Sequence, residues 1–232
     1  DGGNGGILAI EAPKLGFAAR AAAAPAPLLT VDSVKLPNHA RFYQPNDVRT
    51  LPAADPMLKE LTVKRVAKGQ QLVARYELPD GISAVVTGDL TDGAATLSLR
   101  LKLTPPRPLR PSEAVRVPSV VFPMVSALRI GPQSEDDLLA TGLVQGELLP
   151  NPAAANTKRN MAYPGRCCVP WQDLYDPQGG LALIPLSPAS QQIEVLTETG
   201  NGAVALGTRW WTLLEPGETF DSPVVELSAH AG

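Results

Sequence analysis

The side chains best suited to chemistry gather in residues 163–176, which hold two Tyr, one Trp, one Arg and two Asp in a chain with only 5% aromatic residues. Within this segment Trp171, Asp173 and Tyr175 alternate, so on a strand they share one face. An aromatic ring can stack on a sugar while a carboxylate accepts hydrogen bonds from its hydroxyls. A Trp and a Tyr at this spacing are equally typical of a packed core. The segment therefore predicts either carbohydrate contact or core packing.

The candidate contacts for a sugar or a neighbouring domain come from this segment and from a second aromatic position: Tyr163, Arg166, Trp171, Asp173 and Trp210. Trp210 is followed directly by Trp211, and neighbours on a strand point to opposite faces. At least one of these two indoles is therefore expected to face a neighbouring domain, a ligand or solvent.

Histidine and cysteine are scarce in this chain. The two histidines, His39 and His230, are too few for a three-histidine zinc site, and each is interpreted as a solvated surface imidazole. The sequence lacks Gly-x-Ser-x-Gly, Gly-x-x-x-x-Gly-Lys, His-Glu-x-x-His and Cys-x-x-Cys. Cys167 and Cys168 are adjacent and are interpreted as two free thiols. We expect no metal, no cofactor and no catalytic residue in this chain.

An acidic loop at residues 134–137 is the remaining source of paired carboxylates, with Glu147 on a predicted strand beyond it. Two carboxyl groups at a suitable separation can hydrolyse a glycosidic bond. A Ser followed by acidic residues is more simply a turn or a helix N-cap, and we adopt that interpretation.

The elements that must position these residues are strands. The 24 Pro are spread along 232 residues, so almost every window meets Pro or Gly before it completes three helical turns. Residues 58–104 alternate apolar and polar side chains between turn signals, which predicts a meander of four antiparallel strands. Residues 104–111 hold four Pro and predict an extended crossover between two sheets of one domain.

Further strands are predicted on both sides of this meander. They cover residues 6–10, 28–34, 115–121, 126–130, 142–149, 169–175, 180–186, 192–197, 203–214 and 224–229, with an irregular or briefly helical excursion at 18–27. So many strands in one chain indicate an all-β fold, a large antiparallel β-sandwich of two packed sheets, in which residues 1–232 form a single domain.

Charge and hydrophobicity exclude two classes of partner. The net charge is −3 without a basic block, so we expect no nucleic acid. No 18-residue apolar run occurs, so we expect no membrane span. The sequence does not indicate a cellular compartment.

Several motifs resemble the N-terminal β-sandwich of multidomain glycoside hydrolases in the clan of α-galactosidases and endo-α-N-acetylgalactosaminidases. These motifs are the start of the chain at 1–10, Gly-Glu-Leu-Leu-Pro-Asn-Pro at 146–152, Tyr-Pro-Gly at 163–165, Trp-Gln-Asp-Leu-Tyr-Asp at 171–176, Gly-Gly-Leu at 179–181 and the exit strand at 222–232. The resemblance implies the galactose-mutarotase-like "supersandwich" form. Cys167, Cys168 and the Ala-rich stretch at 18–27 depart from the pattern.

In the family that these motifs resemble, the exit strand leads into a catalytic (β/α)₈ barrel that carries the nucleophile and the acid/base carboxylates. The resemblance thus implies a non-catalytic module of a carbohydrate-active enzyme, whose partners are carbohydrate and the barrel of the same polypeptide. Because this chain stops at Gly232, hydrolase activity of the chain alone is in doubt. Full burial of both Trp171 and Tyr163 would contradict the sugar contact.

Two alternatives stay open at this point. One is a self-sufficient sugar epimerase or lyase of the mutarotase-like fold, which would use a His with a Glu or Asp as acid and base. A histidine within about 4 Å of a carboxylate on a concave sheet face would favour it. The other is a purely structural or interaction domain that binds no sugar.

Overall fold

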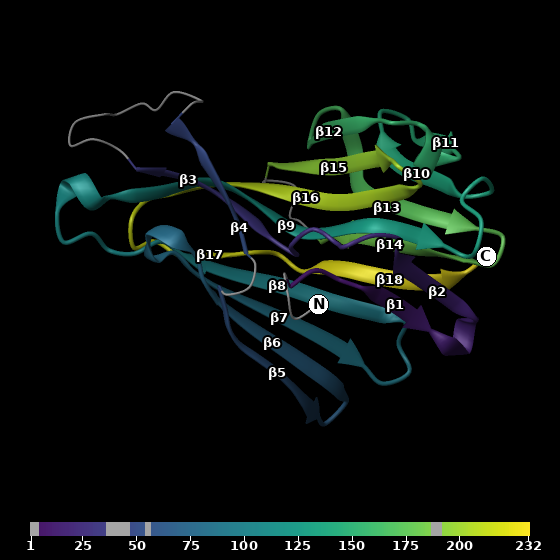
Figure 1. Cartoon of the computed structure of the whole chain (residues 1–232), viewed down its shortest axis with the longest axis horizontal. Helices are drawn as coiled ribbons and strands as arrows, with labels where there is room; N and C mark the ends of the chain where they lie inside the picture. Colours follow the sequence, from purple (N-terminus) through teal and green to yellow (C-terminus); the bar gives the residue numbers. More distant parts are fainter. Residues whose placement is uncertain (1–4, 36–46, 54–56, 187–191) are drawn as a thin grey trace.

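The computed structural model describes residues 5–35, 47–53, 57–186 and 192–232. Within them it holds two antiparallel sheets, one with 8 strands and one with 10, and short 3₁₀ turns in place of α-helices (Figure 1). The all-β, two-sheet sandwich predicted from the sequence is confirmed. Among the described residues no helix has the length and hydrophobicity needed to cross a bilayer.

The smaller sheet has 8 strands in the order β1-β2-β9-β16-β15-β12, with β3 added to β9 and β4 added to β3. The strands are β1 (Ala9–Ala12), β2 (Phe17–Ala21), β3 (Thr30–Lys35), β4 (Arg49–Pro52), β9 (Val115–Ile130), β12 (Lys158–Tyr163), β15 (Ile193–Gly200) and β16 (Ala203–Leu214).

The large sheet has 10 strands in the order β11-β10-β13-β14-β18-β8-β7-β6-β5, with β17 added to β8. The strands are β5 (Leu58–Val66), β6 (Gly69–Glu77), β7 (Ser83–Thr91), β8 (Thr96–Thr104), β10 (Leu138–Leu143), β11 (Glu147–Pro150), β13 (Cys167–Asp176), β14 (Gly179–Pro185), β17 (Phe220–Asp221) and β18 (Val225–Ala231). In the view of Figure 1 the blue-to-teal strands β5 to β8 fan out along one side of the molecule.

Alternation of side chains explains why these segments form half-buried strands. In β8, Leu99, Leu101 and Leu103 are at most 3% exposed, while Arg100 and Lys102 between them face solvent. The predicted meander of four strands is confirmed as β5-β6-β7-β8. The predicted crossover is also confirmed, because β8 lies in the large sheet and β9 in the smaller one.

Three predicted elements differ from the structure. Residues 115–121 and 126–130 belong to one strand, β9, and the segment predicted as one strand at 142–149 is divided between β10 and β11 by a turn. The Ala-rich excursion begins with strand β2, because residues 19–21 pair with 128–130 of β9. Strands β4, β12 and β17 are additional to the prediction.

The core lies between the two sheets and draws on nearly the whole described chain, from Phe17 to Ala229. Trp210 and Phe122 are its largest fully buried side chains. The indole nitrogen Nε1 of Trp210 donates a hydrogen bond of 2.6 Å to the carbonyl oxygen of Phe122. This bond satisfies the one polar group that the Trp side chain brings into the interior.

Candidate functional site on the outer face of the large sheet

Strand β13 places three of the sequence-predicted side chains on the face of the large sheet that is turned away from the core. Gln172 and Leu174 are fully buried, whereas Trp171, Asp173 and Tyr175 between and beside them are half-buried. The prediction that these three side chains share one face is confirmed. We call this side of the sheet the outer face.

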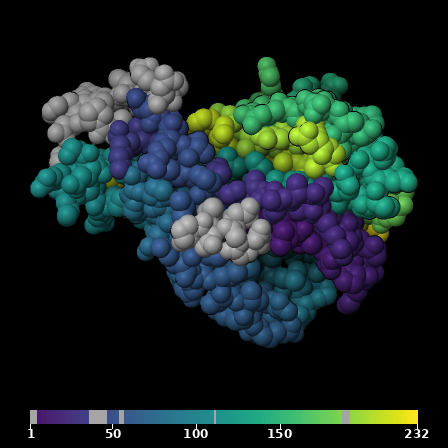
Figure 2. All heavy atoms as spheres, viewed as in Figure 1, coloured from purple at the N-terminus to yellow at the C-terminus, as the bar shows by residue number. Residues whose placement is uncertain are grey.

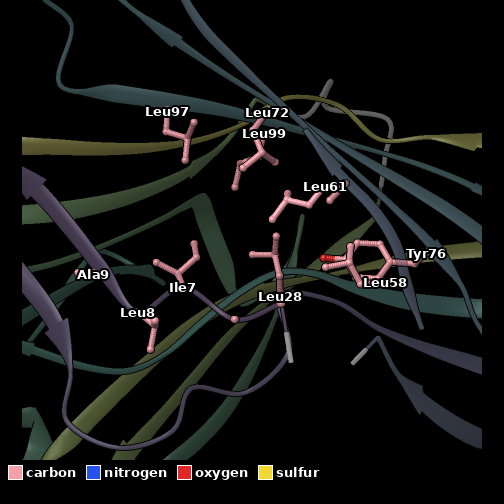
Figure 3. A pocket seen from close by; sticks show the side chains of 14 residues that line it. Ile7, Leu8, Ala9, Leu28, Leu58, Leu61, Leu72, Tyr76, Leu97 and Leu99 are labelled. Atoms are coloured by element: carbon pink, nitrogen blue, oxygen red, sulfur yellow. The ribbon is translucent and has the colours of Figure 1, made fainter. Parts of the chain in front are cut away.

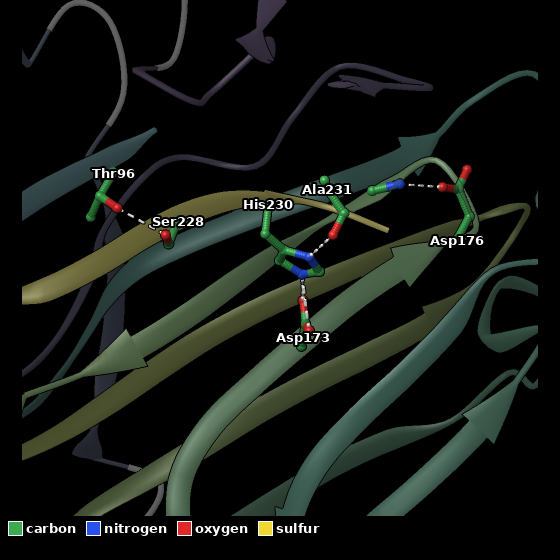
Figure 4. A network of polar contacts seen from close by, with 7 residues as sticks. Thr96, Asp173, Asp176, Ser228, His230 and Ala231 are labelled. Atoms are coloured by element: carbon green, nitrogen blue, oxygen red, sulfur yellow. Dashed lines mark hydrogen bonds and ion pairs between the residues drawn. The ribbon is translucent and has the colours of Figure 1, made fainter. Parts of the chain in front are cut away.

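His230 of β18 reaches Asp173 across the intervening strand β14. Its Nε2 lies 3.0 Å and 3.1 Å from the two carboxylate oxygens of Asp173, and its Nδ1 lies 2.8 Å from the carbonyl oxygen of Ala231 (Figure 4). Both neighbours are acceptors, so both ring nitrogens are satisfied when the imidazole is protonated and donates twice.

A glycine makes this crossing possible. Gly180 of β14 pairs with Tyr175 on one side and with His230 on the other. A Cβ at position 180 would overlap both the imidazole of His230 and the Cβ of Tyr175. The absence of a side chain on β14 therefore creates the space in which His230 lies over the strand.

The electrostatics of the pair favour the charged imidazole. Partial burial alone would lower the pKa of His230, but the Ala231 carbonyl and the Asp173 carboxylate together raise that pKa above its ordinary value of 6.5. An imidazole with a raised pKa, held in one orientation by these two acceptors, can exchange a proton with a ligand that displaces one of them.

The polar surface continues along the outer face to β8. The hydroxyls of Ser228 and Thr96 lie 2.8 Å apart, on the strand of His230 and its neighbour (Figure 4). The outer face thus presents an aromatic portion on β13 and a row of hydroxyl and imidazole groups on β18 and β8. This combination suits a ligand that has both an apolar ring face and hydroxyl groups.

The structure separates Tyr163 and Arg166 from this face. Tyr163 lies on β12 of the smaller sheet, where it is half-buried and packs against the core. Arg166 is exposed in the turn between β12 and β13. Neither Trp171 nor Tyr163 is fully buried, so the condition set to contradict sugar contact is not met.

Trp210 cannot contact a ligand, because it is 0% exposed in the core. Trp211, its neighbour, is 38% exposed, and the guanidinium of Arg209 lies 5.9 Å from the centre of its ring. The prediction that at least one of the two indoles faces outward is confirmed, and it is Trp211.

The acidic loop holds a buried carboxyl that the sequence did not reveal. Asp137 is 1% exposed, and its Oδ1 has no hydrogen-bond partner among the described residues. Burial, and then the charges of Asp176 and Asp136, raise the pKa of Asp137 to about 7.

The described residues hold no group of three or more His, Cys, Asp or Glu that could bind a metal ion.

A pocket of about 430 Å³ lies on the opposite, inner side of the large sheet. Its lining is almost entirely aliphatic and includes Leu28, Leu58, Leu61, Leu72, Leu97 and Leu99 (Figure 3). Figure 2 shows the surface hollowed here, between the purple N-terminal strands and the blue-to-teal strands of the large sheet. With so few polar groups, this pocket is unsuited to the hydroxyls of a sugar.

Comparison with known proteins gave matches at the level of structure alone. No protein-family model matches the sequence, and no curated protein matches it. An α-galactosidase of Lactobacillus brevis superposes with a TM-score of 0.58 at 14% identity, over 86% of this chain and 31% of that one.

Two further solved structures agree with this match. A GH36 α-galactosidase of Geobacillus stearothermophilus gives a TM-score of 0.55 at 13% identity, over 89% of this chain and 30% of that one. An α-N-acetylgalactosaminidase of Bifidobacterium bifidum gives a TM-score of 0.59 at 11% identity, over 92% of this chain and 32% of that one. The chain spans about a third of the length of each, and it has the fold of one domain of such glycoside hydrolases, as the motifs predicted.

Proposed function

We propose that this chain is a non-catalytic β-sandwich module of a glycoside hydrolase, which packs on a (β/α)₈ catalytic barrel of the same polypeptide. The observation that carries the proposal is the coverage of the structural matches: 86% to 92% of this chain, but only 30% to 32% of the hydrolases. The sequence also lacks the nucleophile motifs named above.

The outer face is the surface that we assign to carbohydrate or barrel contact. Trp171 offers a half-buried ring, and Asp173, hydrogen-bonded to His230, offers acceptor oxygens beside it. Arg166 and Tyr163 lie apart from the outer face and stay as separate candidates for domain contact, and Trp210 is removed from the candidate set because it is buried.

An activity assay tests the module hypothesis. The chain alone should not hydrolyse 4-nitrophenyl α-galactoside or 4-nitrophenyl N-acetyl-α-galactosaminide, whereas the longer polypeptide encoded by its gene should hydrolyse at least one. Turnover by the isolated chain that an outer-face variant such as Asp173→Asn abolishes would contradict a non-catalytic module.

A binding experiment tests the sugar contact separately. Galactose and N-acetylgalactosamine should shift the NMR signals of the Trp171 indole in a saturable way, and Trp171→Ala should abolish binding. Trp211→Ala is the matched control, because that exposed indole belongs to β16 of the other sheet. No saturable shift for either sugar would leave the outer face as a purely structural surface.

The pair His230 and Asp173 favours a second candidate function, a mutarotase-like epimerase or lyase. The separation of 3.0 Å meets the distance part of the condition stated above, about 4 Å, whereas its other part, a concave sheet face, is not established for the outer face. His39, the other histidine, lies outside the described residues. The test is the rate at which the optical rotation of freshly dissolved α-galactose reaches equilibrium. Acceleration that Asp173→Asn and His230→Gln both remove would support this function, and an uncatalysed rate would exclude this reaction.

A further inference from the structure

Strand β5 ends the large sheet and leaves one edge without a partner strand. In the described part of the chain it pairs only with β6. From Glu60 to Val66, beyond an irregularity in the pairing between Leu58 and Glu60, every second residue therefore directs its backbone N–H and C=O away from the sheet, where a further strand can pair. The other end strands, β1, β4 and β11, have four residues each, whereas β5 has nine. β12 has six, and its charged side chains are basic only.

The inner face of this edge is unusually apolar for a strand open to water. Leu61 is 52% exposed and Val63 is 60% exposed, and both point to the same side as Leu72 and Ala74 of β6, which line the apolar pocket. Leu61 itself lines the pocket as well (Figure 3). A long, exposed edge with this much apolar surface is typical of a strand that adds to another.

The sequence of β5 is complementary to itself in one antiparallel register. When Thr62 lies opposite Thr62 of a second copy, Glu60 lies opposite Lys64 and Lys64 opposite Glu60, both on the outer face. In the same register Leu61 and Val63 lie opposite each other on the inner face. Centring the pair on Leu61 or Val63 instead forms no such ion pair and sets apolar side chains opposite Lys59 or Arg65.

Two like-charged positions also meet in this register, and the structure already neutralises both. Lys59 would lie opposite Arg65, but the Lys59 ammonium lies 3.4 Å from the carboxylate of Glu77. The guanidinium of Arg65 donates two hydrogen bonds, of 2.9 Å and 2.6 Å, to Asp92. Repulsion at the ends of the pairing is therefore reduced. Glu60 also has a partner in its own chain, Arg75 at 3.1 Å, so the cross-strand attraction between Glu60 and Lys64 is shared with that pair.

We infer that β5 is a self-association surface, which pairs antiparallel with β5 of a second copy of this chain about Thr62. The pairing joins two large sheets edge to edge. It brings the half-exposed Leu61 and Val63 of one copy beside Val63 and Leu61 of the other. The proposed carbohydrate surface on β13 and β18 is not involved, so the inference does not depend on the proposed function.

A charge-reversal series tests the register. Sedimentation velocity across a range of concentrations should show a reversible dimer for the unmodified chain. Lys64→Glu should weaken the dimer roughly tenfold or more, because two attractive cross-strand pairs become repulsive. The double variant Glu60→Lys/Lys64→Glu should restore most of the affinity. Lys68→Glu, in the turn just beyond β5, is the matched control and should dimerise normally.

Two further measurements keep the outcome decisive. Glu60 also lies 3.1 Å from Arg75 within its own chain, so replacing it removes an intrachain ion pair. Circular dichroism of the single variant Glu60→Lys should match that of the unmodified chain. With the exposed Cys168 replaced by Ser, Thr62→Cys should give a disulfide-linked dimer under mild oxidation, and adding Leu61→Lys and Val63→Lys should prevent it. A chain that stays monomeric at its highest soluble concentration, or a dimer insensitive to Lys64→Glu, would overturn the inference.

Discussion

Gly180 is the residue on which the His230–Asp173 pair depends. Replacing it with Ala would place a Cβ in the volume of the imidazole, so we expect Gly180→Ala to displace His230 from Asp173. The pKa of His230 should then fall towards its ordinary value, and the fold should lose roughly 1 to 3 kcal/mol through overpacking. NMR titration of the imidazole and urea denaturation measure the two effects. Ile184→Val, further along the same face of β14 and opposite Glu226, should leave both nearly unchanged.

Asp173 should make stability depend on pH through His230. The pKa of His230 in the folded state is raised above its ordinary value of 6.5. The stability that the protonated imidazole adds to the fold is therefore fully present below pH 6.5 and is lost as the pH rises through the folded pKa. Asp173→Asn removes the carboxylate, so the variant should lose stability relative to the unmodified chain below pH 6.5 and much less at pH 9. Tm measured across this range tests the sign, and an equal loss at both ends would be inconsistent with it.

Asp137, an acidic residue, should also make the stability of the fold depend on pH. Its folded pKa of about 7 exceeds the ordinary 3.8, so the folded state retains a proton that the unfolded chain has released. Stability is then full below about pH 4 and falls as the pH rises towards and through 7. Asp137→Asn should flatten this fall in Tm between pH 4 and 8. The exposed neighbour variant Asp136→Asn should retain most of it.

Residue-level prediction succeeded where it needed only local geometry. The period of two along a strand was enough to put Trp171, Asp173 and Tyr175 on one face. It also showed that Trp210 and Trp211 diverge, but not which of them is buried, because that depends on the side of β16 against which the second sheet packs. The partner of Asp173 was missed, because the register from β13 through β14 to β18 brings together residues 57 positions apart.

At the scale of elements, Trp210 is the largest of the side chains that β16 contributes to the core. Trp210→Ala should destabilise the fold by about 3 to 5 kcal/mol, because it leaves a large cavity and removes the donor to the Phe122 carbonyl. Trp211→Ala, one residue further on the exposed side, should have an effect below about 1 kcal/mol. Urea denaturation followed by circular dichroism gives both values, and similar losses would contradict the assignment of the two faces.

Strand β9 shows why predicted boundaries failed while the strands themselves were found. Two strands are predicted here, at 115–121 and 126–130, and Pro123 in the gap between them cannot donate to a sheet ladder. The strand nevertheless continues, because its pairing with β16 is irregular around this position: the register shifts between Val204 and Leu206 and again between Gly207 and Arg209. Bulges of this kind accommodate a missing donor, and they leave no pattern that period-two reasoning can detect.

At the scale of the whole molecule, the two halves of the chain are interleaved. β8 from the first half pairs with β18, and β3 pairs with β9 across the Pro-rich connector. The core likewise combines residues from Phe17 to Ala229. We expect residues 1–232 to unfold as one domain, with Trp fluorescence and far-ultraviolet circular dichroism giving coincident urea transitions. Separate transitions for the two halves would disprove the single domain.

The position of β18 has a consequence for biosynthesis. This strand is the last of the described strands along the chain, yet it lies inside the large sheet between β14 and β8. A ribosome therefore delivers every other strand of that sheet before the one that joins its two parts. Until Val225–Ala231 has emerged from the ribosome, β8 of the meander and β14 each have an unpaired edge. Chaperones that bind exposed strands can act on these two edges during that interval.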